Sequence, residues 1–145
     1  MRRLALIVGT LISLPSLAAP LVFRSVNEPA VLYDTPSTKG VKQWVILRGT
    51  PVEAILGLDL WVKVRDSAGT IAWIEKKALG NQRTVIVTTD SAEFHQQADA
   101  ASPVEFALGK DVVLELQEKL ASGWVKVKHR EGSVGYLRAT DVWGE

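Results

Sequence analysis

Apolar and polar residues alternate in short runs over most of the chain after residue 21. Glycine, proline, aspartate and serine separate these runs, and all four residue types favour turns. A period of two is typical of strands that bury one face. The pattern therefore predicts an all-β fold. The expected strands cover residues 30–33, 43–47, 52–56, 61–65 and 70–74, and then residues 92–95, 104–108, 112–116, 123–128 and 133–137.

The sequence Trp-Val-Lys-Val occurs at residues 61–64 and again 63 positions later, at residues 124–127. Residues 69–74 and 78–79 align with later segments at the same offset, and residues 48–52 align with 108–112 at an offset of 60. The difference of three predicts a change of length in the loop before the second tryptophan. Such self-similarity indicates two copies of one unit. We expect the units at residues 22–80 and 82–145, joined by a short polar break.

Residues 113–120 can also be drawn with helical spacing. We favour a strand, because the aligned segment, residues 52–55, follows Pro51 and has a β pattern. Small units with five short strands usually close into barrels, which removes exposed sheet edges. The expected architecture is therefore two small β-barrels in tandem.

The first residues have the pattern of a secretory signal peptide. Arg2 and Arg3 precede an apolar run over residues 4–14, which Pro15 and small residues follow. This order predicts a signal peptide over residues 1–18 with cleavage after Ala18. The 11 apolar residues would rise about 16 Å as a helix, whereas a bilayer core is about 30 Å thick. A permanent membrane anchor is the less favoured alternative, and we expect a periplasmic or secreted protein.

Charge and cysteine content exclude several classes of function. The formal net charge of +1 falls to about −1 when Arg2 and Arg3 are removed, so no basic excess favours nucleic acid or anionic membranes. The absence of cysteine excludes disulfides and cysteine chemistry. His95 and His129, the only histidines, have no local cluster of further metal ligands. We expect no catalytic activity, no cofactor and no metal.

The ordered motifs resemble those of the bacterial SH3 (SH3b) domain family. They cover residues 48–52, 61–64 and 72–74 in the first copy, and 109–112, 123–127 and 132–137 in the second. The first copy departs from the family pattern at Ala72 and at Asp59-Leu60, where the family prefers glycine. The resemblance, which covers nearly the whole mature chain, implies tandem SH3-like barrels that bind a ligand or position a partner, as in exported tandem SH3-like proteins.

Strand geometry suggests which aromatic residues could contact a ligand. Val62 and Val64 share one face of their strand and are expected in the core, as are Val125 and Val127 in the second copy, which leaves Trp61 with charged residues on the other face. The same holds for the second copy, and the resemblance places Tyr33, or His95 in the second copy, at the first aromatic position of the eukaryotic SH3 groove. The candidate ligand-binding residues are Tyr33, Trp61, Trp73, His95, Trp124 and Tyr136.

The alternative is that these aromatic residues pack on the loops of their own barrel or on the other barrel. A polyproline groove is not expected, because its further aromatic and proline positions are replaced. The replacements are Thr35, Glu75 and Ala78 in the first copy, and Gln97, Arg138 and Asp141 in the second. Trp44 and Trp143 are expected to be core or barrel-closing residues.

These observations predict an exported, non-enzymatic binding or adaptor protein of the bacterial cell envelope. Its partner would be a peptide, peptidoglycan or another envelope protein. One alternative is a structural scaffold without a small ligand, whose barrels pack against each other through the candidate aromatic residues. A more remote alternative is an accessory to a cell-wall hydrolase.

Overall fold

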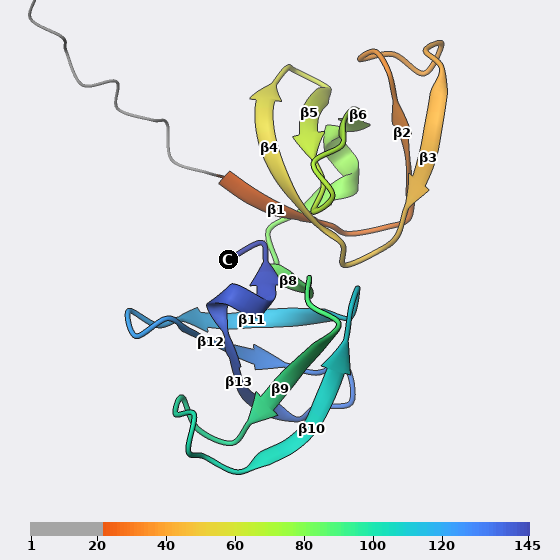
Figure 1. The fold of residues 1–145 in the computed structure, drawn as a ribbon. Helices are drawn as coiled ribbons and strands as arrows, with labels where there is room; N and C mark the ends of the chain where they lie inside the picture. Colours follow the sequence, from red (N-terminus) through yellow and green to blue (C-terminus); the bar gives the residue numbers. More distant parts are fainter. Residues whose placement is uncertain (1–21) are drawn as a thin grey trace, which may run out of the picture.

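The computed structural model describes residues 22–145, so the predicted signal peptide lies outside the described residues. These residues form two antiparallel sheets of seven strands, one for each copy of the repeat (Figure 1). The strand order is β3-β2-β6-β5-β4-β1-β7 in the first sheet and β10-β9-β13-β12-β11-β8-β14 in the second. The predicted all-β fold with two tandem units is confirmed.

The elements of the first barrel are β1 (Val22–Val26), β2 (Ala30–Tyr33), β3 (Lys42–Ile46), β4 (Pro51–Gly57), β5 (Trp61–Arg65), β6 (Ile71–Glu75), the single-turn 3-10 helix η1 (Lys76–Ala78) and β7 (Leu79–Gly80). Those of the second are β8 (Thr84–Val87), β9 (Ser91–His95), β10 (Val104–Gly109), β11 (Val113–Lys119), β12 (Trp124–Lys128), β13 (Val134–Arg138), η2 (Ala139–Asp141) and β14 (Val142–Trp143).

All ten predicted strands are present, and residues 113–119 are a strand as predicted. The expectation of five strands per unit was incomplete. Each sheet also contains a strand that comes first along the chain, β1 or β8, and a two-residue strand at its edge, β7 or β14. The four residues of β8 are all buried. A strand buried on both faces has no alternation of apolar and polar residues, so the period-two pattern does not identify it.

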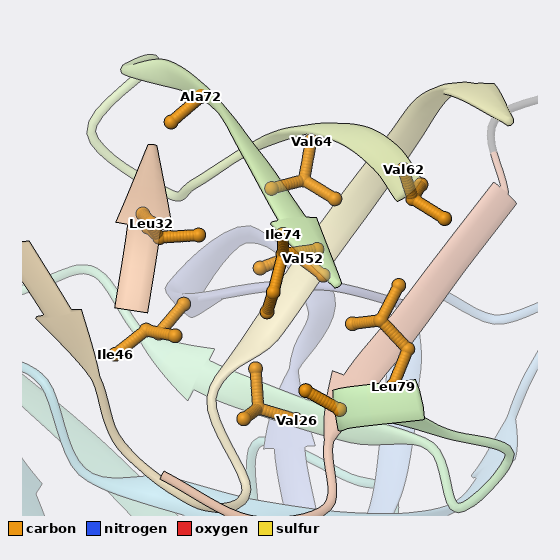
Figure 2. Packing of buried hydrophobic residues seen from close by; sticks show 10 residues of the cluster. Val26, Leu32, Ile46, Val52, Val62, Val64, Ala72, Ile74 and Leu79 are labelled. Carbon is orange, nitrogen blue, oxygen red and sulfur yellow. The ribbon is translucent and has the colours of Figure 1, made fainter. Parts of the chain in front are cut away.

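Each barrel has its own apolar core. Figure 2 shows the first core, in which Val62 and Val64 of β5 pack with Leu32, Val52 and Ile74. Val125 and Val127 occupy the same positions in the second core. The predicted role of the four valines as core residues is confirmed. Within residues 22–145, no helix is long and apolar enough to cross a membrane.

The structure corrects the alignment of the two copies upstream of the tryptophan. Gly49 and Asp111 both have positive φ values, 84° and 69°. Their N–H groups donate to the carbonyls of Val26 and Val87, at 2.7 and 2.9 Å, where β1 and β8 end. Residue 49 therefore corresponds to residue 111, at an offset of 62, and the predicted offset of 60 is wrong. Aspartate tolerates the left-handed conformation better than most residues, so it replaces glycine in this turn of the second copy.

The barrels contact each other through β1, β8 and β14. The rings of Phe23 and Trp143 lie edge to face with centroids 5.0 Å apart, and the Arg83 guanidinium lies 5.6 Å from the Phe23 ring. The Thr84 hydroxyl donates to the Gly49 carbonyl at 2.6 Å. Trp143 thus lies in the closing strand of its sheet and also contacts the other barrel. The alternative in which the barrels pack through the candidate aromatic residues is wrong.

Candidate functional site

A groove of about 590 Å³ lies at one end of the first barrel. The β2–β3 loop, the β4–β5 loop and the segment from the end of β6 into η1 form its walls. Its apolar surface comes from Pro36, Leu60 and Trp61. Its charged residues are Asp59, Glu75, Lys76 and Lys77. The groove therefore combines one aromatic ring and aliphatic surface with both signs of charge.

Trp61 is held in place by its strand and by Tyr33. It is the first residue of β5 and pairs with Glu75 of β6. Its ring packs edge to face on the ring of Tyr33, with centroids 5.5 Å apart. Tyr33 is only 7% exposed. It packs against the buried side of Trp61, and the half-buried Trp61 lines the groove.

The β2–β3 loop that forms one wall is held by its own hydrogen bonds. A carboxylate oxygen of Asp34 accepts from the Val41 N–H at 2.8 Å, and the Asp34 N–H donates to the Val41 carbonyl at 3.1 Å. A side chain at Gly40 would collide with Thr35 and Asp34. These contacts fix the wall without a ligand, which lowers the entropic cost of binding.

The corresponding tryptophan of the second barrel is covered. Trp124 is 7% exposed. Its ring packs edge to face on His95 at 5.1 Å, and the Arg138 guanidinium lies 5.1 Å from its centroid. Arg138 occupies the position that Glu75 has in the first barrel. Trp124 therefore lies on the expected face of its strand and packs within its own barrel, which is the alternative given above for the candidate aromatic residues.

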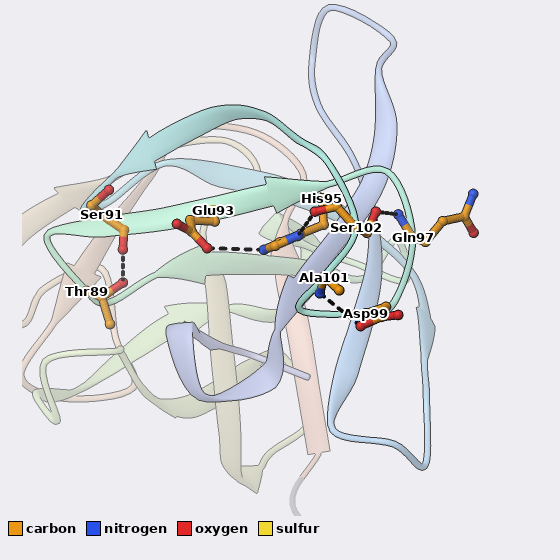
Figure 3. A network of polar contacts seen from close by, with 8 residues as sticks. All are labelled: Thr89, Ser91, Glu93, His95, Gln97, Asp99, Ala101 and Ser102. Atoms are coloured by element: carbon orange, nitrogen blue, oxygen red, sulfur yellow. Dashed lines mark hydrogen bonds and ion pairs between the residues drawn. The ribbon is translucent and has the colours of Figure 1, made fainter.

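His95 connects β9 to the loop that follows it (Figure 3). The ring is 2% exposed. Its Nδ1 lies 3.1 Å from the Ser102 carbonyl oxygen and its Nε2 lies 3.2 Å from a carboxylate oxygen of Glu93. Both partners are acceptors, so a ring nitrogen that carries a proton can donate to the partner it faces. His95 is thus a buried link within the second barrel.

Trp73 and Tyr136 are half-buried, as the strand pattern predicts. They pair with Tyr33 and His95 across neighbouring strands. The Lys63 ammonium lies 5.8 Å from the Trp73 ring centroid. Neither residue lines the groove at Trp61.

The structure therefore separates the six predicted residues into two contacting pairs, Tyr33 with Trp61 and His95 with Trp124, and two flanking residues. Sequence reasoning missed Pro36, Leu60 and Lys76 in the groove. The signal for Leu60 was present, since a leucine stands where the family prefers glycine before the tryptophan. In the described part of the chain, no three histidine, aspartate or glutamate side chains are grouped to hold a metal ion.

Comparison with solved structures finds similar proteins at low identity. NlpC2 from Trichomonas vaginalis is 13% identical with a TM-score of 0.40, and the match covers 87% of this chain and 49% of that chain. NlpC1 from Trichomonas vaginalis is 12% identical with a TM-score of 0.41, and the match covers 96% of this chain and 51% of that chain. An NlpC/P60 family protein from Bacillus cereus ATCC 10987 is 16% identical with a TM-score of 0.37, and the match covers 84% of this chain and 56% of that chain. The chain thus spans about half the length of these proteins.

No curated protein matches the chain. The family model of the bacterial SH3 domain matches it twice, over residues 26–80 and 90–144. The first match runs from the last residue of β1 to the end of β7. The second match runs from the residue before β9 to the residue after β14. Both matches contain the tryptophan and the core valines of the repeated motif. The chain therefore belongs to the bacterial SH3 domain family, with two such domains in tandem.

Proposed function

We propose that this protein is a non-enzymatic binding protein of the bacterial cell envelope, and that its first barrel binds a peptide segment in the groove at Trp61. The observation that carries the proposal is the open groove beside Trp61, whose counterpart Trp124 is covered by Arg138. Family membership supports a periplasmic or secreted location, because bacterial SH3 domains occur in exported and envelope proteins.

The chemistry of the groove fits a short peptide that carries both an amine and a carboxylate. The indole of Trp61 offers a flat apolar surface with a polar N–H, as aromatic residues do in peptide-binding grooves. Asp59 and Glu75 can attract an ammonium group, and Lys76 can attract a carboxylate. A peptide of the cell wall and a segment of an envelope protein both have this composition.

The test is co-sedimentation with purified peptidoglycan, using a matched pair of exposed leucines on the same hairpin. Leu60 lines the groove and is 70% exposed, whereas Leu56 is 50% exposed and lies outside it. We expect Trp61→Ala to weaken binding about tenfold or more and Leu60→Ser to weaken it severalfold. Leu56→Ser should bind like the wild type. Unchanged binding by Trp61→Ala would exclude the groove, and absence of wild-type binding would exclude the wall ligand.

A structural scaffold is the second candidate function, and the surface of the first barrel favours it. Nine of the large apolar side chains that are exposed in the described residues belong to the first barrel and two to the second. A protein partner that covers this surface would contact Leu56 and Leu58 of the β4–β5 hairpin. In that case Leu56→Ser would weaken capture of the partner from envelope extracts, and Leu60→Ser alone would not abolish it. The same pair of variants therefore separates the two functions.

A further inference from the structure

A second hollow, which we name the inter-barrel cleft, lies where the barrels meet and has a volume of about 530 Å³. It is lined by Arg48 from the first barrel and by Asp111, Val112, Val113, His129 and Arg130 from the second. Neither barrel forms this cleft alone. We propose that the inter-barrel cleft binds an oxyanion, the carboxylate or phosphate group of a ligand, between Arg48 and Arg130.

The cations in the cleft are available to a ligand. Arg48 and Arg130 are exposed, and among residues 22–145 neither guanidinium pairs with a carboxylate within 4.0 Å. Asp111 is the one carboxylate among the lining residues, so the positive charges exceed the negative. Two guanidinium groups can each donate charge-assisted hydrogen bonds to the oxygens of a carboxylate or a phosphate.

His129 adds a further donor. Its Nδ1 lies 3.4 Å from the N–H of Glu131, which makes Nδ1 an acceptor. This leaves Nε2 as the ring nitrogen that can donate to an oxyanion in the cleft when it carries a proton.

The backbone that carries Arg48 is anchored to both barrels. The next residue, Gly49, donates its N–H to the Val26 carbonyl at 2.7 Å within the first barrel. The Gly49 carbonyl accepts the hydroxyl of Thr84, which belongs to β8 of the second barrel. Gly49 also approaches Val113 closely, since a Cβ added at Gly49 would lie 3.6 Å from a methyl group of that residue. These contacts place Arg48 beside the second barrel and fix the turn before any ligand binds.

Comparison of equivalent turns shows that the basic residues are not required by the fold. The β12–β13 turn carries His129 and Arg130, whereas the β5–β6 turn of the first barrel has Asp66 and Ser67 at these positions. A carboxylate oxygen of Asp66 accepts the N–H groups of Ala68 and Thr70 at 3.0 and 2.9 Å and so closes its own turn. The basic pair thus occurs in the turn that faces Arg48 of the other barrel.

The inference does not rest on the groove at Trp61, which lies elsewhere on the first barrel and is lined by other residues. An oxyanion that accepts hydrogen bonds from Arg48 and Arg130 adds a link between the barrels to the Phe23–Trp143 and Thr84–Gly49 contacts. A ligand of this kind therefore stabilises one orientation of the two barrels.

The test is an NMR titration of the whole chain with inorganic phosphate and, separately, with acetate, at constant ionic strength. We expect saturable shifts at Arg48, at residues 111–113 and at residues 129–130. Arg48→Gln and Arg130→Gln should each weaken phosphate binding about tenfold, as expected for loss of a charge-assisted hydrogen bond. Lys42→Gln, which removes an exposed cation outside the cleft, should leave it unchanged.

Asp111→Asn is expected to strengthen phosphate binding, in contrast to the two arginine variants. Asparagine tolerates the positive φ of residue 111, so the turn is kept while a repulsive charge is removed, and phosphate should bind severalfold more tightly. Shifts with phosphate alone would assign the cleft to phosphate-bearing ligands, and shifts with both anions would also admit carboxylates. Shifts that do not saturate with either anion, or binding that persists unchanged in both arginine variants, would overturn the proposal.

Discussion

The two barrels have the same strand order but use the tryptophan of the repeated motif differently. In the first, Trp61 packs on Tyr33 and lines a groove. In the second, Trp124 is buried between His95 and Arg138. The residue at the end of β6 or β13 makes the difference, because Arg138 covers the ring whereas Glu75 pairs with Lys77 at 3.3 Å. The same motif thus supplies a groove wall in one copy and an internal packing residue in the other.

The outer surface of the first barrel is also more apolar than that of the second. The register of the sheets aligns Ile55 and Leu56 with Gln117 and Glu118. Leu56 is 50% exposed and Ile55 is 42% exposed. The second barrel shows that this fold tolerates polar residues here, so core packing does not explain the apolar ones. Exposed apolar surface of this kind is typical of contact sites.

One core contact explains a departure from the family pattern. Gly135 of β13 lies against Phe94, so that an added Cβ would stand 2.2 Å from the phenyl ring. The first barrel has Leu32 at the position of Phe94 and Ala72 at that of Gly135. A smaller side chain on one strand accommodates a larger one on the next. Ala72 is therefore compatible with the fold because its neighbour is leucine.

The largest expected effect separates the two tryptophans by their contribution to stability. We expect Trp124→Ala to lower the free energy of unfolding of the second barrel by about 3 kcal/mol, as for a buried aromatic residue. Trp61→Ala should cost the first barrel about half as much, because its ring is only partly buried. Urea unfolding followed by NMR signals of each barrel measures both values. Equal costs would show that the two rings are equally buried and would remove the distinction between the barrels.

The next effect tests the exchange of size between neighbouring strands. Gly135→Ala should destabilise the second barrel by about 2 kcal/mol, because the methyl group overpacks the core against Phe94. The double variant Gly135→Ala with Phe94→Leu recreates the pair found in the first barrel and should recover the part of this loss that the phenyl ring causes, while the contact of the added Cβ with the His95 carbonyl at 2.7 Å remains. A double-mutant cycle from urea unfolding measures the coupling. Additive effects of the two substitutions would contradict the explanation.

The smallest effect concerns the cover on Trp124. Arg138→Gln removes the cation over the ring and should cost about 0.5–1 kcal/mol. It should also expose the indole to solvent. Incorporation of fluorotryptophan and comparison of its NMR shifts in H₂O and D₂O reports this exposure, with Lys128→Gln, an exposed cation on the neighbouring β12, as the control. An unchanged solvent effect at Trp124 would mean that His95 alone covers the ring.

Much of the fold could be predicted from local patterns, because a half-buried strand leaves a period of two in its sequence. That pattern located ten strands and assigned Val62, Val64, Val125 and Val127 to the cores. It failed for β8, which is buried on both faces. It also misaligned the turn at Gly49, because the equivalent left-handed residue is Asp111 and a nearby glycine matched instead.

The candidate site was only partly predictable. Tyr33 and Trp61 were identified and lie in contact, but the groove also requires Pro36 and Lys76, which come from a loop and a 3-10 turn distant in sequence. His95 and Trp124 were identified by the same reasoning and are buried. Period-two geometry states which side of a strand a residue occupies, and it does not state what covers that side.

The sequence by itself determined the all-β class, the two copies of one unit and the core position of the four valines in the repeated motif, because these depend on local periodicity and on repetition of motifs. The tertiary structure decided which tryptophan is accessible, where the barrels meet and which cations come together in the inter-barrel cleft. These features depend on residues far apart in the chain, such as Arg48 and Arg130, which line one cleft, and Phe23, which packs against Trp143. Only the folded chain brings such residues together.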